Sequence, residues 1–325
     1  MSPPVALITG GSGYIGSALI QALMARGHEP IVAGRRSSLA EISLPSTQLR
    51  YLDLSTNVGF DRATAGIGTV VHCAGLAHNS GPASAYDTIN TLATANLARA
   101  ALWNGVRHFI FISSLNVVPP GVKDPCASTH GWALPPGQYA RSKARAERAL
   151  EDILRGTSCH LTVLRPALVY DLSLTANLSS LATVVSLLPV LLPPMGHRLM
   201  VSRPDLVQLI VNLVHRVPGP SVDNISFLIA ADGQRYSARR IGQALSRGPV
   251  VDKVFMRVPL PIFIWRLLAV LRDRHVGTRC GTTWRSIAGN YWCPPDDIPI
   301  PSVRGWAPRD TFESVIQKKV GRANS

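Results

Sequence analysis

The chain has 325 residues, and 33 Lys and Arg against 19 Asp and Glu give it a net charge of +14 and a pI near 10.3. Its five cysteines are odd in number, scattered and without metal-ligand spacing, which argues against a disulfide framework and a metal site and fits a reducing cytoplasm. The basic residues are spread along the chain without an aromatic–basic platform, which argues against nucleic-acid binding. Such a spread is typical of a composition set by a GC-rich genome, with attraction to anionic substrates or acidic lipids as the alternative.

The N-terminal segment predicts a dinucleotide-binding turn. Residues 5–8 are an apolar, β-prone run that begins too early for a secretory signal and leads into the sequence GGSGYIG at 10–16. A helix-forming stretch follows, so a strand, a glycine turn and a helix lie within about thirty residues. Gly10 permits the tight turn, Gly13 lets the backbone approach a pyrophosphate, and Gly16 allows close helix packing. The expected cofactor contacts here are Gly10, Gly13, Tyr14, Ile15 and Gly16.

The end of the second expected strand, at residues 30–33, indicates which cofactor fits. An acidic residue at this point binds the adenosine ribose of NAD, and Gly34 stands there instead. Arg35 and Arg36 follow, and a guanidinium suits a 2′-phosphate through forked, charge-assisted hydrogen bonds. The sequence therefore favours NADP(H), with NAD as the alternative.

Strands and helices continue to alternate as far as residue 169, which predicts an α/β fold with a parallel sheet covered by helices on both faces. Further strands are expected near residues 49–52, 69–73, 109–112, 161–164 and 226–230, and helices at 205–217 and 237–245. Pro and Gly in residues 118–137 predict a long loop, and such loops commonly carry function.

Two later stretches are strongly apolar. Residues 178–195 are interrupted by three prolines and are too short to span a bilayer, so we interpret them as a helix and loop that cover the substrate. Residues 262–274 combine an apolar face with a Trp and several Arg. They are expected to form a helix that packs in a smaller lobe, with a position at a membrane surface as the alternative.

Tyr139 and Lys143 lie four residues apart on an expected helix, which places a phenol and an ammonium on one face. A neighbouring cation favours the phenolate and lowers the pKa of a Tyr from about 10. The pair therefore suggests acid–base catalysis, with ordinary helix surface as the alternative.

Together these motifs resemble the extended short-chain dehydrogenases/reductases, also called the NAD-dependent epimerase/dehydratase family. The Thr-Gly-x-x-Gly-x-x-Gly spacing that starts at Thr9 is typical of that family, and Ser114 precedes Tyr139 by 25 residues, as the family requires. Similar segments occur in order at 53–54, 70–75, 90–97, 109–114 and 164–170, and the resemblance extends to about residue 232. It implies a Rossmann-type, doubly wound sheet with a smaller C-terminal substrate lobe. Residues 1–170 would form the NAD(P)-binding domain, with possible later returns of the chain, and 171–325 mainly the substrate lobe.

The resemblance implies roles for individual residues. Tyr139 would exchange a proton with a substrate oxygen while hydride moves between the nicotinamide and the same carbon. Lys143 would lower the pKa of Tyr139 and hold the nicotinamide ribose, and Ser114 would stabilise charge on the substrate oxygen. The remaining cofactor contacts would be Asp53, Leu54, Ala74, Gly75, Asn90 and Pro166.

The substrate is also indicated by resemblance. Asn177 and Arg198 occupy positions that contact a UDP diphosphate in the nucleotide-sugar branch, and His78 and Asn116 complete the expected substrate residues. The most similar branch acts on UDP-sugars in bacterial surface polysaccharide synthesis. The expected reaction is reduction of a UDP-4-keto-hexose. A UDP-sugar 4-epimerase with tightly bound NAD, and a steroid- or flavonoid-type ketoreductase, are the alternatives.

The chain also departs from the family pattern. Leu115 and Asn116 replace the Asp-Glu pair of the dehydratases, and Asp171 replaces the Gly that usually follows Tyr170, so dehydration is not expected. A non-catalytic subunit of the same fold is disfavoured because Tyr139 and Lys143 are both present. By analogy a cytoplasmic homodimer is expected.

Overall fold

The computed structural model describes residues 5–77, 82–171, 173, 178, 182, 190–216, 223–246, 258–276, 281, 284, 292–294 and 302–323. The chain divides into two compact units. The first contains residues Met1–Pro166 and Leu206–Ala230, and the second Ala167–Asp205 and Ala231–Ser325.

The first unit is built on a seven-stranded sheet with the order β10-β6-β5-β4-β1-β2-β3, in which all paired strands are parallel. The strands are β1 (Ala6–Thr9), β2 (Ile31–Gly34), β3 (Leu49–Tyr51), β4 (Thr69–His72), β5 (His108–Ile112), β6 (His160–Pro166) and β10 (Ile225–Ala230). The predicted α/β fold with a Rossmann-type parallel sheet is confirmed. Strands buried on both faces read as continuous apolar runs, and every residue of β5 is buried.

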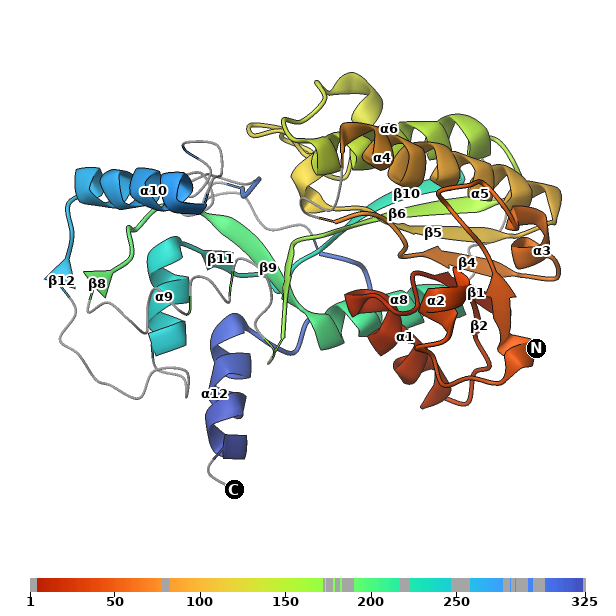
Figure 1. Ribbon diagram of the computed structural model, residues 1–325, viewed down its shortest axis with the longest axis horizontal. Helices are drawn as coiled ribbons and strands as arrows, with labels where there is room; N and C mark the ends of the chain where they lie inside the picture. Colours follow the sequence, from red (N-terminus) through yellow and green to blue (C-terminus); the bar gives the residue numbers. More distant parts are fainter. Residues whose placement is uncertain are drawn as a thin grey trace. The chain divides into compact units, whose positions relative to one another are not determined.

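Helices cover both faces of this sheet: Figure 1 shows α4, α5 and α6 on one face and α1 and α2 on the other. Their bounds are α1 (Tyr14–Met24), α2 (Arg36–Leu39), α3 (Phe60–Thr64), α4 (Ala83–Tyr86), α5 (Ala93–Trp103) and α6 (Gln138–Leu154). A π-helical turn lies at Asp87–Leu92, and 3₁₀ turns lie at Ser46–Gln48, Leu115–Val117 and Thr129–Gly131. The inner faces of α5 and α6 pack on the sheet through a core that includes Leu97, Phe109 and Leu150.

The second unit contains a three-stranded sheet in which β9 (Arg198–Ser202) lies between β7 (Leu168–Tyr170) and β11 (Arg235–Tyr236). A separate pair is formed by β8 (Val190–Leu191) and β12 (Val258–Pro259). The helices are α9 (Ala238–Ser246), α10 (Ile262–Val276) and α12 (Phe312–Ala323). The Asp232 carboxylate accepts hydrogen bonds from the Tyr170 and Tyr236 hydroxyls, at 3.0 and 2.7 Å, inside this unit's core.

Helix α8 (Arg203–His215) contributes residues to both units and begins two residues before its predicted start. The Ser202 hydroxyl explains the earlier start, because it accepts a hydrogen bond from the Asp205 backbone N–H at 3.1 Å and donates one to the Asp205 carboxylate at 2.8 Å. The predicted helix at 262–274 is confirmed as α10, whereas most of 178–195 lies outside the described residues.

Candidate functional site

The glycine turn between β1 and α1 brings the backbone of two strands together. Gly10 has a φ of 73°, and a Cβ on this residue would stand 2.7 Å from the Ala74 backbone nitrogen, just after β4. The Gly13 N–H donates to the Gly10 carbonyl at 3.0 Å, and a Cβ on Gly16 would overlap that same carbonyl. Side chains are therefore excluded from this turn by contact with backbone, as the dinucleotide fingerprint requires.

A cavity of about 260 Å³ opens at the carboxyl ends of β1, β2 and β4. It is lined by seven predicted cofactor residues, which are Gly10, Gly13, Arg35, Asp53, Leu54, Ala74 and Gly75. Ser38, Leu39, Ile42, Ser55 and Ile89 also line it, and the sequence analysis missed them because they stand in no recognisable motif. A cleft at the carboxyl edge of an open parallel sheet is the usual ligand site of such folds.

One polar group of the cavity wall, Asp53, is fixed locally. The Asp53 carboxylate accepts hydrogen bonds from the Ser55 hydroxyl at 2.6 Å and the Ser55 N–H at 2.9 Å, and these bonds lower the pKa of Asp53. Arg35 lines the cavity at the start of α2, whereas the Arg36 guanidinium lies 5.7 Å from the centre of the Tyr51 ring. The two neighbouring arginines therefore occupy different environments.

The remaining predicted cofactor residues do not line the cavity. Tyr14, Ile15 and Gly16 form the first turn of α1, and Pro166 is the buried last residue of β6. The side-chain amide of Asn90 bonds to other residues of the chain. It accepts a hydrogen bond from the Leu76 N–H at 2.7 Å and donates to the Leu76 carbonyl and the Ser142 hydroxyl, at 3.0 and 2.9 Å. Asn90 thus joins the segment after β4 to α6, and a π-helical turn is a frequent setting for such residues.

Tyr139 stands in the first turn of α6 and shares a hydrogen bond with the Ser114 side chain. Ser113, the preceding residue, points the other way and donates to the Glu147 carboxylate. This alternation follows from the end of β5, where successive side chains lie on opposite faces. The structure therefore brings Tyr139 and Ser114 together.

Lys143 is buried one turn further along α6, where its Nζ donates to the Ile112 carbonyl at 2.8 Å and lies 4.6 Å from the centre of the Phe111 ring. A Cβ on Gly75 would stand 3.5 Å from this Nζ, so the ammonium adjoins the cavity wall. Burial lowers the pKa of Lys143 to about 8, although Cys73 and Glu147 oppose the shift.

The expectation that Lys143 lowers the pKa of Tyr139 is wrong for this structure. Burial raises the pKa of Tyr139 to about 12, and the hydrogen bond with Ser114 opposes that shift only in part. The physical reason is that removing a phenolate from water costs more than one hydrogen bond returns. The phenol is therefore held in its protonated form at neutral pH.

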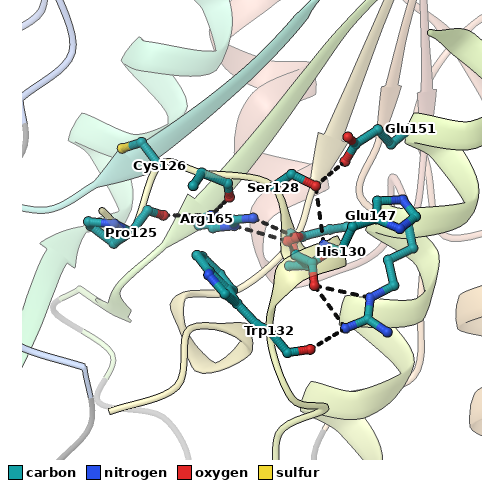
Figure 2. Close-up of polar contacts among 12 residues, drawn as sticks. Pro125, Cys126, Ser128, His130, Trp132, Glu147, Glu151 and Arg165 are labelled. Atoms are coloured by element: carbon teal, nitrogen blue, oxygen red, sulfur yellow. Dashed lines mark hydrogen bonds and ion pairs between the residues drawn. The ribbon is translucent and has the colours of Figure 1, made fainter. Parts of the chain in front are cut away.

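A network of buried polar groups fastens the loop at residues 119–137 to α6, as Figure 2 shows. Arg165, at the end of β6, forms an ion pair with Glu147 of α6 at 2.7 Å, and both side chains are fully buried. The Arg165 guanidinium also donates to the Pro125 and Ala127 carbonyls of the loop, at 2.5 and 3.0 Å. Glu147 therefore links Ser113, just after β5, to Arg165, and Arg165 holds the loop.

Further bonds join the same loop to the same helix. Arg148 donates to the Thr129 and Trp132 carbonyls, at 2.8 and 2.6 Å, and the Ser128 hydroxyl donates to Glu151 at 2.6 Å. Tyr139, Lys143 and Glu147 are spaced by four residues along α6, so one face of this helix carries both the candidate acid–base pair and the anchor of the loop.

The predicted substrate residues are only partly described. His78 and Asn177 lie outside the described residues. Asn116 is exposed on the 3₁₀ turn after β5, and Arg198 is buried in β9 of the second unit, where its Nε donates to the Gly196 carbonyl at 3.1 Å. Within the described part of the chain, no cluster of three or more His, Cys, Asp and Glu side chains is arranged to hold a metal ion.

Comparison with known proteins gives matches over most of the chain. Residues 6–177 match the model of the NAD dependent epimerase/dehydratase family. The chain is 30% identical over 311 residues to the UDP-glucose 4-epimerase of Vibrio cholerae, which covers 91% of this chain and 92% of that protein. It is also 32% identical over 129 residues to a 3-beta-hydroxysteroid dehydrogenase of Mycolicibacterium neoaurum. That match covers 35% of this chain and 33% of that protein.

The fold also resembles solved structures. The structure of MoeE5 in complex with UDP-glucuronic acid and NAD superposes with a TM-score of 0.67 at 19% identity, and the match covers 98% of this chain and 99% of that one. The likeness therefore extends over both compact units.

Proposed function

The chain belongs to the NAD-dependent epimerase/dehydratase family and is an enzyme, and from this premise we propose that it is an NAD(P)-dependent oxidoreductase acting on a nucleotide-sugar. The observation that carries the proposal is the hydrogen-bonded pair of Tyr139 and Ser114, with Lys143 one turn away against the wall of the glycine-turn cavity.

The lining of the cavity is of the kind that binds a dinucleotide. The turn at Gly10 and Gly13 would hold the pyrophosphate, because both glycines line the cavity and neither carries a side chain that would keep an anion from the backbone. Asp53 and Leu54 would contact the adenine, and Arg35 would meet a ribose 2′-phosphate, which favours NADP(H) over NAD. The bound cofactor supplies the hydride.

The residues of α6 and β5 supply the proton chemistry. Tyr139 keeps its proton at neutral pH, so it would donate to a ketone oxygen as that carbon becomes an alcohol. Ser114 would stabilise the developing negative charge by a second hydrogen bond. The buried Lys143 would place a positive charge close to the nicotinamide ribose.

Reduction of a UDP-4-keto-hexose, a step of surface polysaccharide synthesis in bacteria, is the reaction that these features support best. Reduction of a ketone needs a proton donor, and Tyr139 is protonated at neutral pH. Arg35 suits NADPH, the cofactor from which reductases commonly take their hydride. Epimerisation of a UDP-sugar at C4 is the second candidate, supported by the likeness to the Vibrio cholerae enzyme along nearly the whole chain. The steroid-type ketoreductase is supported by a sequence similarity that covers 35% of the chain.

The second unit would bind the sugar nucleotide, with Arg198 and Asn177 on its diphosphate. Cys73, Cys126 and Cys159 are free thiols, which supports the proposal of a cytoplasmic location. In the described part of the chain, no helix is long and apolar enough to cross a membrane.

The test begins with purified protein. The nucleotide released on denaturation is identified, and NADPH oxidation is followed with UDP-4-keto-sugars, beside interconversion of UDP-glucose and UDP-galactose without added cofactor. Consumption of NADPH supports the reductase, and interconversion with retained NAD supports the epimerase. Tyr139→Phe should lower either activity by about 10²–10⁴-fold and leave cofactor binding intact. Unchanged turnover in that variant contradicts the assigned proton donor, and Tyr51→Phe, on an exposed ring, is the control.

A further inference from the structure

Helix α10 presents an apolar stripe to solvent. Phe263, Leu267 and Leu271 are 69%, 58% and 51% exposed, and their spacing of four residues places them on one face of the helix. Leu268, which adjoins this face, is 38% exposed. An ordinary surface helix carries polar residues at such positions.

The exposed stripe is not the face by which α10 packs on its own unit. Trp265, Ala269 and Asp273 form a second row at the same spacing, and their exposed fractions are only 3%, 2% and 0%. Trp265 belongs to the hydrophobic core of the second unit. Because this row already anchors the helix, the outer stripe is free for a further contact.

The exposed charged residues of α10 have one sign. Arg266, Arg272, Arg274 and His275 are exposed, whereas Asp273, the single acidic residue of α10, is buried. At 100° per residue, Arg266 and Arg272 lie on opposite sides of the stripe and Arg274 lies at its C-terminal end. An apolar face bordered by guanidinium groups is complementary to a bilayer surface, where acyl chains lie beneath anionic phosphates.

We propose that α10 binds the surface of membranes that contain acidic phospholipids. The helix lies in the plane of the interface, with Phe263, Leu267 and Leu271 among the acyl chains and the arginines at the phosphates. Its 15 residues are too few to span a bilayer, so the contact is peripheral. The chain's net charge of +14 adds a long-range attraction to the same surface.

The test is co-sedimentation of the full-length protein with vesicles of phosphatidylcholine and phosphatidylglycerol in equal parts, beside vesicles of phosphatidylcholine alone. Binding is expected to the acidic vesicles, and it should weaken in high salt because the phosphates are then screened. The double variant Leu267→Ser, Leu271→Ser should bind at least about tenfold more weakly, since burial of each leucine in hydrocarbon contributes about that factor.

The matched control is Trp103→Ser, which removes an aromatic side chain that is 87% exposed on α5 of the other unit. This variant should bind vesicles as the unchanged protein does, and circular dichroism should show that all variants are folded. Failure of the unchanged protein to bind acidic vesicles, or equal binding by the leucine variant, overturns the proposal. A change from dimer to monomer in the leucine variant, without vesicle binding, assigns the stripe to a second copy of the chain and also overturns it. None of these readouts requires a substrate, so the outcome is independent of the proposed reaction.

Discussion

Burial acts in opposite directions on the two ionisable groups of the candidate catalytic helix. The pKa of Tyr139 is raised to about 12 and that of Lys143 is lowered to about 8, because each group loses water that would stabilise its charged form. The phenol of Tyr139 therefore stays protonated, and the pKa of the Lys143 amine comes close to physiological pH. Lys143 is thus the group of this pair that titrates near physiological pH.

This difference predicts the alkaline limit of the reaction. Lys143 is charged below its pKa, so kcat/KM should fall as the pH rises through about 8, and not near 10.5 where an exposed lysine titrates. The measurement is kcat/KM against pH for the unchanged protein and for Lys143→Arg. The arginine variant should be slower but should lose the limb near pH 8, because a guanidinium stays charged. A profile that is flat beyond pH 10 contradicts the assignment.

Arg35 and Arg36 allow a matched test of cofactor choice. Arg35 lines the cavity, whereas Arg36 stacks on Tyr51. Arg35→Ser should weaken NADPH relative to NADH by about 10–100-fold, the usual worth of a charge-assisted hydrogen bond to phosphate. Fluorescence titration with both cofactors measures the ratio, and Arg36→Ser should leave it nearly unchanged. Equal effects of the two substitutions would assign the preference to general positive charge.

At the scale of elements, α6 is joined to the loop before it by the Arg165–Glu147 pair. Both side chains have no exposed surface, and Glu147 also accepts from Ser113 at the end of β5. One carboxylate therefore fixes the helix of Tyr139 against the strand that leads to Ser114. Loss of this carboxylate is expected to disturb the site and the loop together.

Removal of one partner should be severely destabilising, because it leaves the other charge buried and unpaired. Arg165→Met or Glu147→Leu should lower the free energy of unfolding by about 3–5 kcal/mol, and the double variant should recover part of the loss. Urea denaturation of the three variants measures these values. Asp152→Asn, which breaks an exposed contact with His130, should cost less than about 1 kcal/mol. If the single variants are as stable as this control, the pair contributes nothing.

The sequence predicted those elements that local patterns determine. The glycine turn and the parallel strands both follow from residue type and period. The Glu147–Arg165 pair was missed because its geometry depends on how α6 packs against β6, which no local pattern records. The predicted direction of the pKa shift of Tyr139 was wrong for a related reason, because burial is a property of the folded chain and not of a local sequence pattern.

At the scale of the whole molecule, buried histidines couple stability to pH. His72 bridges the Thr9 and Thr94 hydroxyls at 2.7 and 2.8 Å, and His108 contacts the Thr162 hydroxyl at 2.9 Å. Burial lowers the pKa of each of these two histidines to about 3. Both are therefore neutral in the folded protein, whereas in the unfolded chain they take up protons below their ordinary value of 6.5.

Stability should consequently fall as the pH drops from about 6.5 towards 3, because the unfolded chain binds more protons in this interval. Each histidine contributes a slope of up to about 1.4 kcal/mol per pH unit. Urea denaturation between pH 7.5 and 5 measures how the free energy of unfolding changes with pH. His108→Gln should reduce this slope by the amount that one proton contributes, up to about 1.4 kcal/mol per pH unit. His130→Asn, at an exposed position, should not. An identical slope in both variants would exclude His108 as a source.

The order of strands in the first unit has a consequence for biosynthesis. Strand β10 completes the sheet beside β6, yet it is separated from it by the residues that build β7, β8 and β9 of the second unit. When only the first 170 residues of a nascent chain have left the ribosome, β6 is an unpaired edge strand of the sheet. Unpaired edge strands pair readily with other chains. Translation must continue to residue 230 before this edge is covered, so premature truncation in that interval favours aggregation over a shortened working domain.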